Sequence, residues 1–316
     1  MESRITRILL YGFGRMGLTH FAILNGIEHG LQFTILETNK KLVSLLKKNL
    51  PQVRFVTSSK ELGTEPYDLT LITTPPFVHH ALVAESLERG DRRVFVEKPF
   101  GGHSQVTAVP NADSNVYIGY VLRFNPCVQW VKEHIKPEEI VYAKGQYLSN
   151  TIEKKPKGWR NGAFSGVLNE MGSHIIDLLN FLVDLQGSRV VSAQTTSVVS
   201  DIDDIVDASL EDGRGRTIDL HFNWVAKDVR KPTFGLELGL KDGRTVTVDP
   251  QVIRIKQGDQ EVERIAVTDL GAEVPYYLRG VDFTKQMEDL LGPAATLCTQ
   301  EEALTVNRII NDILSV

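Results

Sequence analysis

The sequence predicts an α/β protein of two domains, in which a doubly wound parallel sheet precedes an α+β domain built on a mostly antiparallel sheet. In the first third of the chain, apolar runs of strand length alternate with amphipathic segments of helix length. That alternation is typical of a parallel sheet with helical crossovers. After Pro126, strand-like runs follow one another with few helices between them, which favours antiparallel pairing. A chain of 316 residues can bury a core in each domain.

The expected elements of the first domain alternate regularly along the chain. Strands are expected near Ile5–Tyr11, Gln32–Leu36, Val53–Val56, Leu69–Ile72, Val94–Val96 and Val116–Ile118, and helices near Arg15–Glu28, Lys40–Asn49 and Val78–Arg89.

The second domain is expected to begin near Arg123–Pro126, so that the two domains span residues 1–122 and 123–316. Asp212-Gly213 and Asp242-Gly243 are typical of hairpin turns, and the acidic run Asp201–Asp204 is interpreted as a hairpin tip because it lacks the spacing of a calcium loop. Strands are expected near Ile140–Leu148, Val190–Val198, Arg216–Phe222, Gly235–Leu240 and Arg244–Val248.

Composition excludes several classes of protein. A net charge of −5 without any basic block argues against a nucleic-acid partner. No apolar run approaches the roughly 18 residues of a membrane span, and Met1–Arg4 leads into the first strand without a signal peptide. Cys127 and Cys298 lie far apart and lack metal-ligand spacing, so we expect no metal and a reducing, cytoplasmic location.

A glycine motif follows the first strand-like run. In a Rossmann βαβ unit, Gly12 would permit the tight turn, Gly14 would let the backbone approach a pyrophosphate, and Gly17 would let the helix pack close to the sheet. The phosphates would lie at the positive end of that helix. We therefore expect cofactor contacts from Gly12, Phe13, Gly14, Arg15, Met16 and Gly17.

An acidic residue stands where such a site needs one. The second apolar run ends in Glu37, twenty positions beyond Gly17, where a carboxylate accepts the adenosine ribose hydroxyls. Glu37 would repel a 2′-phosphate, which favours NAD over NADP. Lys40 and Lys41 could soften that preference, so NADP stays possible.

Three further segments complete a family pattern: Thr73–His79, Glu97-Lys98-Pro99 and Leu168–Asp177. With the glycine motif, the chain resembles the glucose–fructose oxidoreductase / inositol dehydrogenase (Gfo/Idh/MocA-type) family over essentially its whole length. The Glu-Lys-Pro tripeptide and the Gly-Ser-His-x-x-Asp segment are the most specific elements. The resemblance implies an oxidoreductase that uses NAD or NADP on a secondary alcohol of a sugar, polyol or sugar nucleotide.

The turn at Thr74-Pro75 follows a parallel strand, at the edge where ligands collect in open α/β sheets. By itself, the segment is also compatible with a simple strand-to-helix turn. The resemblance implies that Thr74 and Pro75 lie beside the cofactor and that His79 holds the turn rather than doing chemistry.

A lysine stands at the end of the fifth expected strand. In a closed cleft, the ammonium of Lys98 could polarise a substrate oxygen or relay a proton, whereas by itself it could equally be a surface lysine. The resemblance implies that Lys98 points at both nicotinamide and substrate, with Glu97 in a supporting role beside the cofactor.

The segment around Gly172 carries three titratable side chains. If a helix begins there, His174 and Asp177 lie on one face, and a carboxylate can orient an imidazole that exchanges a proton. An ordinary surface ion pair is the plain alternative, and the spacing lacks the paired His or Cys ligands of a zinc site. The resemblance implies His174 as acid/base and Glu170 as the orienting carboxylate, where the family more often has aspartate.

Substrate contacts are expected from two further segments. Gly119–Pro126 resembles the family's entry into its second domain, where Tyr120, Arg123 and Asn125 can line the pocket or simply secure a hinge. The basic loop Thr151–Arg160 is either solvated, or it covers the cleft and contacts an anionic substrate such as a sugar nucleotide or sugar acid. The segment Gly101–Asn115 is too short and polar for the helix that the family usually has there. Together with Asp177 from the segment around Gly172, the expected substrate contacts are Tyr120, Arg123, Asn125, Trp159 and Arg160.

Two alternatives to an alcohol dehydrogenase stay open: a regulator that senses dinucleotide or sugar, and a reductase of an imine or a conjugated double bond. The presence of Lys98, Glu170 and His174 together favours an enzyme. We also expect a homodimer or homotetramer, because alternating apolar residues near Phe234–Leu240 could form an exposed apolar sheet face. The alternative is that this face is buried against the helix near Ile175–Leu182. The apolar positions are Phe234, Leu236, Leu238 and Leu240.

Overall fold

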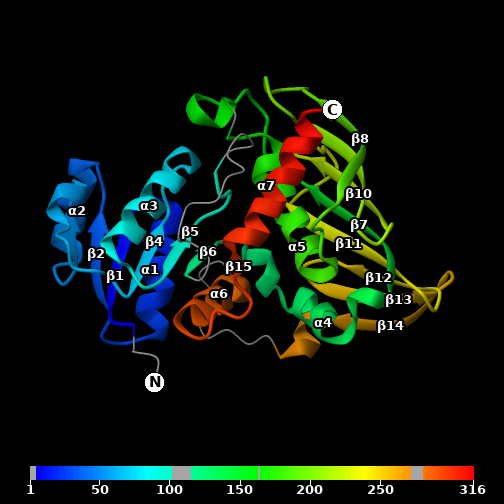
Figure 1. Cartoon of the computed structure of the whole chain (residues 1–316), viewed down its shortest axis with the longest axis horizontal. Helices are drawn as coiled ribbons and strands as arrows, with labels where there is room; N and C mark the ends of the chain where they lie inside the picture. The colour runs from blue at the N-terminus through cyan, green and yellow to red at the C-terminus, as the bar shows by residue number, and fades with distance from the viewer. Residues whose placement is uncertain (1–4, 102–114, 163, 272–279) are drawn as a thin grey trace. The chain divides into compact units, whose positions relative to one another are not determined.

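The computed structural model describes residues 5–101, 115–162, 164–271 and 280–316 (Figure 1). Of these, residues 5–101, 115–120 and 280–301 form one compact unit, and residues 121–162, 164–271 and 302–316 form the other. The expected division into 1–122 and 123–316 therefore needs a correction, because a helix and a strand near the C-terminus return to the first unit. None of the helices in the described ranges is long and apolar enough to cross a bilayer.

The first unit contains the expected parallel sheet, with strand order β15-β6-β5-β4-β1-β2-β3. Only β15 runs antiparallel to its neighbour. The strand order reverses between β1 and β4, which makes the sheet doubly wound. In sheets of this kind, ligands bind beside that point, at the carboxyl ends of the strands. The strands are β1 (Arg7–Tyr11), β2 (Gln32–Leu36), β3 (Arg54–Val56), β4 (Leu69–Ile72), β5 (Val94–Val96), β6 (Val116–Ile118) and β15 (Cys298–Thr299).

Helices cover this sheet and exclude water from its strands. All residues of β4 and β5 are buried, as expected where helices cover both faces of a parallel sheet. The C-terminal helix of the unit packs against the first one. The helices are α1 (Arg15–Ile27), α2 (Lys40–Asn49), α3 (His79–Arg89) and α6 (Val281–Leu291).

The second unit is built on an eight-stranded sheet of order β14-β13-β12-β11-β7-β10-β9-β8. Its pairs are antiparallel except for β7 with β10. Asp212-Gly213 connects β9 to β10 and Asp242-Gly243 connects β11 to β12, so both hairpin predictions are confirmed. The strands are β7 (Ile140–Leu148), β8 (Arg189–Thr196), β9 (Ile205–Glu211), β10 (Thr217–Asn223), β11 (Thr233–Leu240), β12 (Arg244–Val248), β13 (Val252–Gln257) and β14 (Gln260–Ala266).

Helices α4 (Pro126–His134), α5 (Ser173–Val183) and most of α7 (Gln300–Leu314) belong to this second unit. Helix α5 packs on β7 so closely that a Cβ atom at Gly145 would overlap Ile175. This face of the sheet is therefore the core of the unit.

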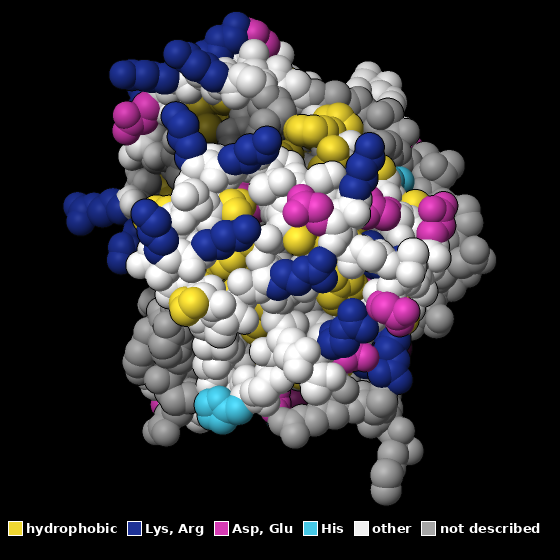
Figure 2. All heavy atoms as spheres, turned by 90° about the vertical axis from the view of Figure 1, so that its left-hand side faces the viewer, with side chains coloured by type: hydrophobic (Ala, Val, Ile, Leu, Met, Phe, Trp, Pro, Cys, Tyr) yellow, Lys and Arg dark blue, Asp and Glu magenta, His cyan; other side chains and the backbone are white. Residues whose placement is uncertain are grey.

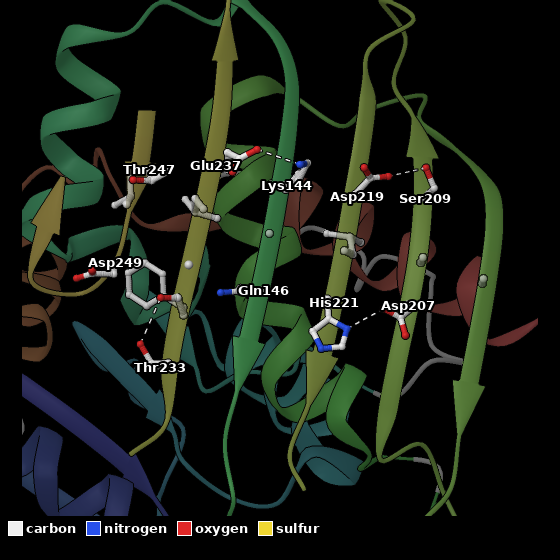
Figure 3. A pocket seen from close by; sticks show the side chains of 18 of the residues that line it. Lys144, Gln146, Asp207, Ser209, Asp219, His221, Thr233, Glu237, Thr247 and Asp249 are labelled. Carbon is white, nitrogen blue, oxygen red and sulfur yellow. Dashed lines mark hydrogen bonds and ion pairs between the residues drawn. The ribbon is translucent and has the colours of Figure 1, made fainter. Parts of the chain in front are cut away.

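The prediction that the apolar residues of Phe234–Leu240 form an exposed face of the sheet is wrong. Phe234, Leu236, Leu238 and Leu240 are each at most 5% exposed, so they belong to the interior of their own unit. The opposite face is polar and carries cross-strand pairs: Lys144 with Glu237 at 3.0 Å, Ser209 with Asp219 at 2.9 Å, and His221 with Asp207 at 2.7 Å (Figure 3). These residues line a shallow cavity of about 810 Å³.

A buried ion pair anchors α5. Arg123 donates from Nε and Nη2 to the two carboxylate oxygens of Asp177, at 2.9 and 2.7 Å. Its Nη1 lies 3.0 Å from Glu302, and its guanidinium lies over the ring of Phe181. Arg123 and Asp177 are each no more than 1% exposed. A bidentate pair in this position fixes α5 to the turn before α4.

We expect Arg123→Met to lower the free energy of unfolding by about 3–5 kcal/mol, because the change leaves the Asp177 carboxylate buried without its partner. Urea unfolding would measure this. The double variant Arg123→Met/Asp177→Leu should recover much of the loss. A single variant within about 1 kcal/mol of the unmodified protein would contradict a structural role for the pair.

Candidate functional site

The glycine loop has the shape that a dinucleotide requires. Gly12 adopts φ +83°, in the left-handed region that favours glycine, and a Cβ atom at Gly17 would overlap the carbonyl oxygen of Gly12. A Cβ atom at Gly14 would meet no described atom within 4 Å. Packing of the described residues therefore does not demand a glycine at Gly14, whereas the close approach of a pyrophosphate would.

The surroundings of this loop agree with that use. Helix α1 begins directly after Gly14, without a side-chain cap on its first N–H groups, so these groups can bind phosphate oxygens. Arg15 is exposed and Met16 half-buried. The ring of Phe13 packs against Phe21 and Phe55, which leaves its backbone for cofactor contacts.

Glu37 is fixed beside the glycine loop. Its carboxylate accepts hydrogen bonds from the N–H groups of Phe13 at 2.9 Å and Asn39 at 2.8 Å. Each oxygen keeps a further lone pair for a ribose hydroxyl. Lys40 and Lys41 are exposed at the start of α2, and Figure 2 shows Lys and Arg side chains interspersed with Asp and Glu on the face turned to the viewer.

His79 joins the loops that follow β4 and β5. Its Nε2 lies 2.8 Å from the carbonyl oxygen of Thr74, and its Nδ1 lies 3.0 Å from that of Pro99. Burial lowers the pKa of His79, although both carbonyls and the Glu97 carboxylate act in the opposite direction. The neutral ring has one N–H and donates it to one of these two carbonyl oxygens, so His79 lies between the Thr74-Pro75 turn and the Glu97-Lys98-Pro99 segment.

Lys98 is half-buried at the carboxyl edge of the parallel sheet, directly after Glu97. The Glu97 side chain contacts His20 of α1. The Glu97 side chain is 12% exposed, and its expected place beside the cofactor stays a prediction. His20 was not predicted, because a single histidine in an apolar helix gives no sequence signal for a site.

The second unit presents Glu170 and His174 around a local change of helix type. A π-helical turn, Leu168–Gly172, leads into α5, and such turns are frequent at functional sites. Glu170, in the π-helical turn, and His174, in α5, are both half-buried, whereas nearly all the remaining residues of α5 are buried. The Ser165 hydroxyl donates to Oε1 of Glu170 at 2.5 Å.

Asp203 holds the start of this π-helical turn. Its Oδ2 accepts from the N–H of Leu168 at 2.7 Å, and its carbonyl oxygen accepts from the N–H of Val167 at 2.9 Å. Neither Ser165 nor Asp203 was predicted as part of the site. Asp203 lies between β8 and β9, which pair antiparallel, so the hairpin tip expected at Asp201–Asp204 is present.

Three expected substrate residues have structural partners. Arg123 and Asp177 bind each other in the core, which favours a structural role over the expected substrate contacts. Asn125 accepts from the N–H of Cys127 at 3.0 Å and so caps α4, while its amide donates to the carbonyl oxygen of Pro250 at 3.2 Å.

The remaining expected substrate residues are Tyr120, Trp159 and Arg160. Tyr120 is buried and is the last residue of the first unit before the chain enters the second. The side chains of Trp159 and Arg160 and the segment 102–114 lie outside the described residues. Lys155 of the basic loop and Asn161, the residue directly after that loop, both contact the Asp201 carboxylate.

The candidate residues thus divide over the two units. The first unit brings together Gly12, Glu37, Thr74, His79 and Lys98 at one sheet edge, which is the part that can hold a dinucleotide. The second contributes Glu170 and His174. Among the described residues, no cluster of three or more His, Cys, Asp or Glu side chains could hold a metal ion.

Comparison with known proteins agrees with this geometry. A family model described as an oxidoreductase family with an NAD-binding Rossmann fold matches residues 6–108, and the GFO/IDH/MocA C-terminal domain matches residues 137–240. No curated protein sequence matches the chain.

Several solved structures share the fold. Levoglucosan dehydrogenase in complex with NADH and levoglucosan has a TM-score of 0.81 at 16% identity, over 99% of this chain and 96% of that one. UDP-N-acetylglucosamine 3-dehydrogenase from Acidithiobacillus ferrooxidans has a TM-score of 0.73 at 18% identity, over 99% and 97%. An oxidoreductase domain protein from Kribbella flavida has a TM-score of 0.82 at 20% identity, over 99% and 97%.

At these identities the solved structures establish the fold, and the two family models establish the family. The chain belongs to the GFO/IDH/MocA family of NAD-dependent oxidoreductases.

Proposed function

We propose that the protein transfers a hydride between NAD and a secondary alcohol or ketone of a sugar, polyol or sugar nucleotide. The observation that carries this proposal is the presence of Lys98 at the cofactor edge of the first unit together with Glu170 and His174 in the second. The similar folds of a levoglucosan dehydrogenase and a UDP-N-acetylglucosamine dehydrogenase support a carbohydrate substrate.

The residues of the chain supply binding and proton transfer. In the oxidation direction, His174 accepts the hydroxyl proton while the hydride leaves the same carbon, so one proton and one hydride depart and a carbonyl forms. The Lys98 ammonium stabilises the negative charge that develops on the oxygen. Glu170, held by Ser165, orients the imidazole. NAD, when bound, accepts the hydride at its nicotinamide ring.

Two alternatives use the same cofactor site. A reductase of an imine or conjugated double bond needs no base for an alcohol, and a regulator needs none of the three polar residues. The half-buried positions of Lys98, Glu170 and His174 favour the alcohol dehydrogenase.

A substrate screen tests the proposal directly. Sugars, polyols and sugar nucleotides, including levoglucosan, sorbose and UDP-N-acetylglucosamine, are incubated with NAD or NADP, and reduction is followed by the absorbance of the reduced nicotinamide. Oxidation of one of these alcohols supports the proposal. Turnover confined to imines or conjugated double bonds would replace it.

Cofactor preference should depend on Glu37. The unmodified protein is expected to bind NADH more tightly than NADPH, because the carboxylate repels a 2′-phosphate. Glu37→Gln should reduce this difference by about tenfold in the ratio of affinities, whereas Glu61→Gln, at an exposed carboxylate of the same unit, should leave it unchanged. Titration calorimetry measures both; equal or reversed affinities in the unmodified protein contradict the role of Glu37.

Catalysis should depend on Lys98 and His174. Lys98→Ala and His174→Ala are each expected to lower kcat by about 100-fold or more and to leave NADH binding nearly intact, since both act on the reacting oxygen. Lys60→Ala and His29→Ala are the matched controls. If His174→Ala keeps full turnover, the acid/base role belongs to another residue.

A homodimer or homotetramer remains part of the proposal. The open face of the eight-stranded sheet is the surface we assign to it, and its paired charges of both signs suit a two-fold contact. Light scattering at micromolar concentration is expected to give at least twice the chain mass. Lys144→Glu should favour the monomer, because it places a second negative charge beside Glu237, whereas Lys241→Glu should not. A monomer mass for the unmodified protein would overturn this.

A further inference from the structure

A buried pair inside the first unit involves a residue with no role in the proposed reaction. The Nε2 atom of His20, on α1, lies 2.6 Å from Oε1 of Glu97. The His20 side chain is fully buried, and that of Glu97 is 12% exposed. A carboxylate withdrawn from water needs a hydrogen-bond donor, and the imidazole N–H of His20 supplies one.

The surroundings of the ring determine which nitrogen carries the proton. Nδ1 of His20 is buried and has no hydrogen-bond partner among the described residues. The ring packs against the aromatic rings of Phe95 and Phe283, with centroids 5.3 and 6.3 Å away. A proton on Nδ1 would be an unsatisfied donor in apolar surroundings. The proton therefore belongs on Nε2, where His20 donates it to Glu97.

A glycine next to the pair leaves room for it. At Gly119, a Cβ atom would lie 2.8 Å from the Phe95 ring and 3.4 Å from Oε2 of Glu97. A larger residue would have to displace the ring or crowd the carboxylate. Three separate segments, α1, the end of β5 and the residue after β6, therefore together define the position of the Glu97 side chain.

Both neighbours of Lys98 are held by other parts of the unit. The N–H of Glu97 donates to the carbonyl oxygen of Ile72 at 2.9 Å, and its carboxylate contacts His20. On the other side, the carbonyl oxygen of Pro99 lies 3.0 Å from Nδ1 of His79. His20 and His79, from α1 and α3, thus hold the backbone on either side of the lysine.

We propose that His20 is a positioning residue for Lys98: by donating its Nε2–H to Glu97, it fixes the backbone from which the lysine side chain extends. The inference rests on the proposed role of Lys98 in the reaction. Without the donor, the buried carboxylate would have to turn toward water to be solvated. That rotation moves the residue that immediately precedes Lys98.

Three variants separate the hydrogen bond from the packing of the ring. His20→Leu removes the donor at similar volume, and His20→Gln keeps an amide N–H within reach of Glu97. Phe283→Leu is the matched control, because it removes a ring that packs on His20 and leaves the pair itself intact. Amide hydrogen exchange at Glu97 and at Gly101, whose N–H donates to Pro99 at 2.9 Å, reports on the segment without any substrate.

For His20→Leu, we expect exchange at both amides to be at least about tenfold faster and kcat to fall about 10- to 100-fold, with KM and NADH affinity within about twofold. His20→Gln and Phe283→Leu should stay close to the unmodified protein in both measurements. The turnover assay uses the substrate that the screen identifies.

Several results would overturn the proposal. Unchanged exchange and kcat in His20→Leu would show that the pair does not position the segment. An equal loss in His20→Gln or Phe283→Leu would assign the effect to ring packing. If even the unmodified protein oxidises no alcohol, the proposed reaction fails, whereas the exchange measurements still decide whether His20 fixes the segment around Lys98.

Discussion

The close packing of α1 against the end of β1 is the constraint on which the first unit depends. Only glycine at position 17 lets the helix start beside the carbonyl oxygen of Gly12. Because α1 starts there, His20, one turn further on, reaches Glu97 at the end of β5. The glycine motif therefore leaves Gly14 open toward a pyrophosphate and also places the helix that holds the neighbour of Lys98. The glycine motif and the Glu97-Lys98-Pro99 segment, far apart in the sequence, are thus joined through the contact between His20 and Glu97.

In the second unit, two buried carboxylates fix the backbone near the candidate residues by accepting hydrogen bonds from N–H groups. Asp204 accepts hydrogen bonds from three consecutive N–H groups at residues 198–200 and from Nε1 of Trp224. Burial raises the pKa of Asp204, but hydrogen bonds from Ser200, Val199 and Trp224 outweigh it and lower the pKa to about 2. The neighbouring Asp203 holds the first N–H of the π-helical turn. An acidic run expected only to form a hairpin tip thus also fixes the segment that carries Glu170 and His174.

The sequence predicts best those features that backbone geometry or two-sided burial imposes. Strand β5 is apolar at every position because helices cover both faces of the parallel sheet, whereas β14 is largely exposed and carries no such run. Gly12 and Gly17 could be predicted because the left-handed backbone of Gly12 and the close helix packing at Gly17 each require glycine. Arg123 and Asp177 could not be assigned, because a charged side chain in a sequence does not show whether it faces a ligand or another charge. That choice is made by tertiary packing.

Glu170 stands where an aspartate is more usual in the family, and neighbouring residues hold the longer side chain in place. A glutamate has one more rotatable bond than the more usual aspartate, so more conformational entropy is lost when it is fixed. Here the Ser165 hydroxyl binds Oε1 at 2.5 Å, and the N–H of Glu170 donates to the carbonyl oxygen of Gly166 at 2.9 Å. Gly166 has φ +107°, and a Cβ atom there would overlap the Asp203 carboxylate. The longer acid therefore belongs to a set with Ser165, Gly166 and Asp203, and that set fixes the position of its carboxylate.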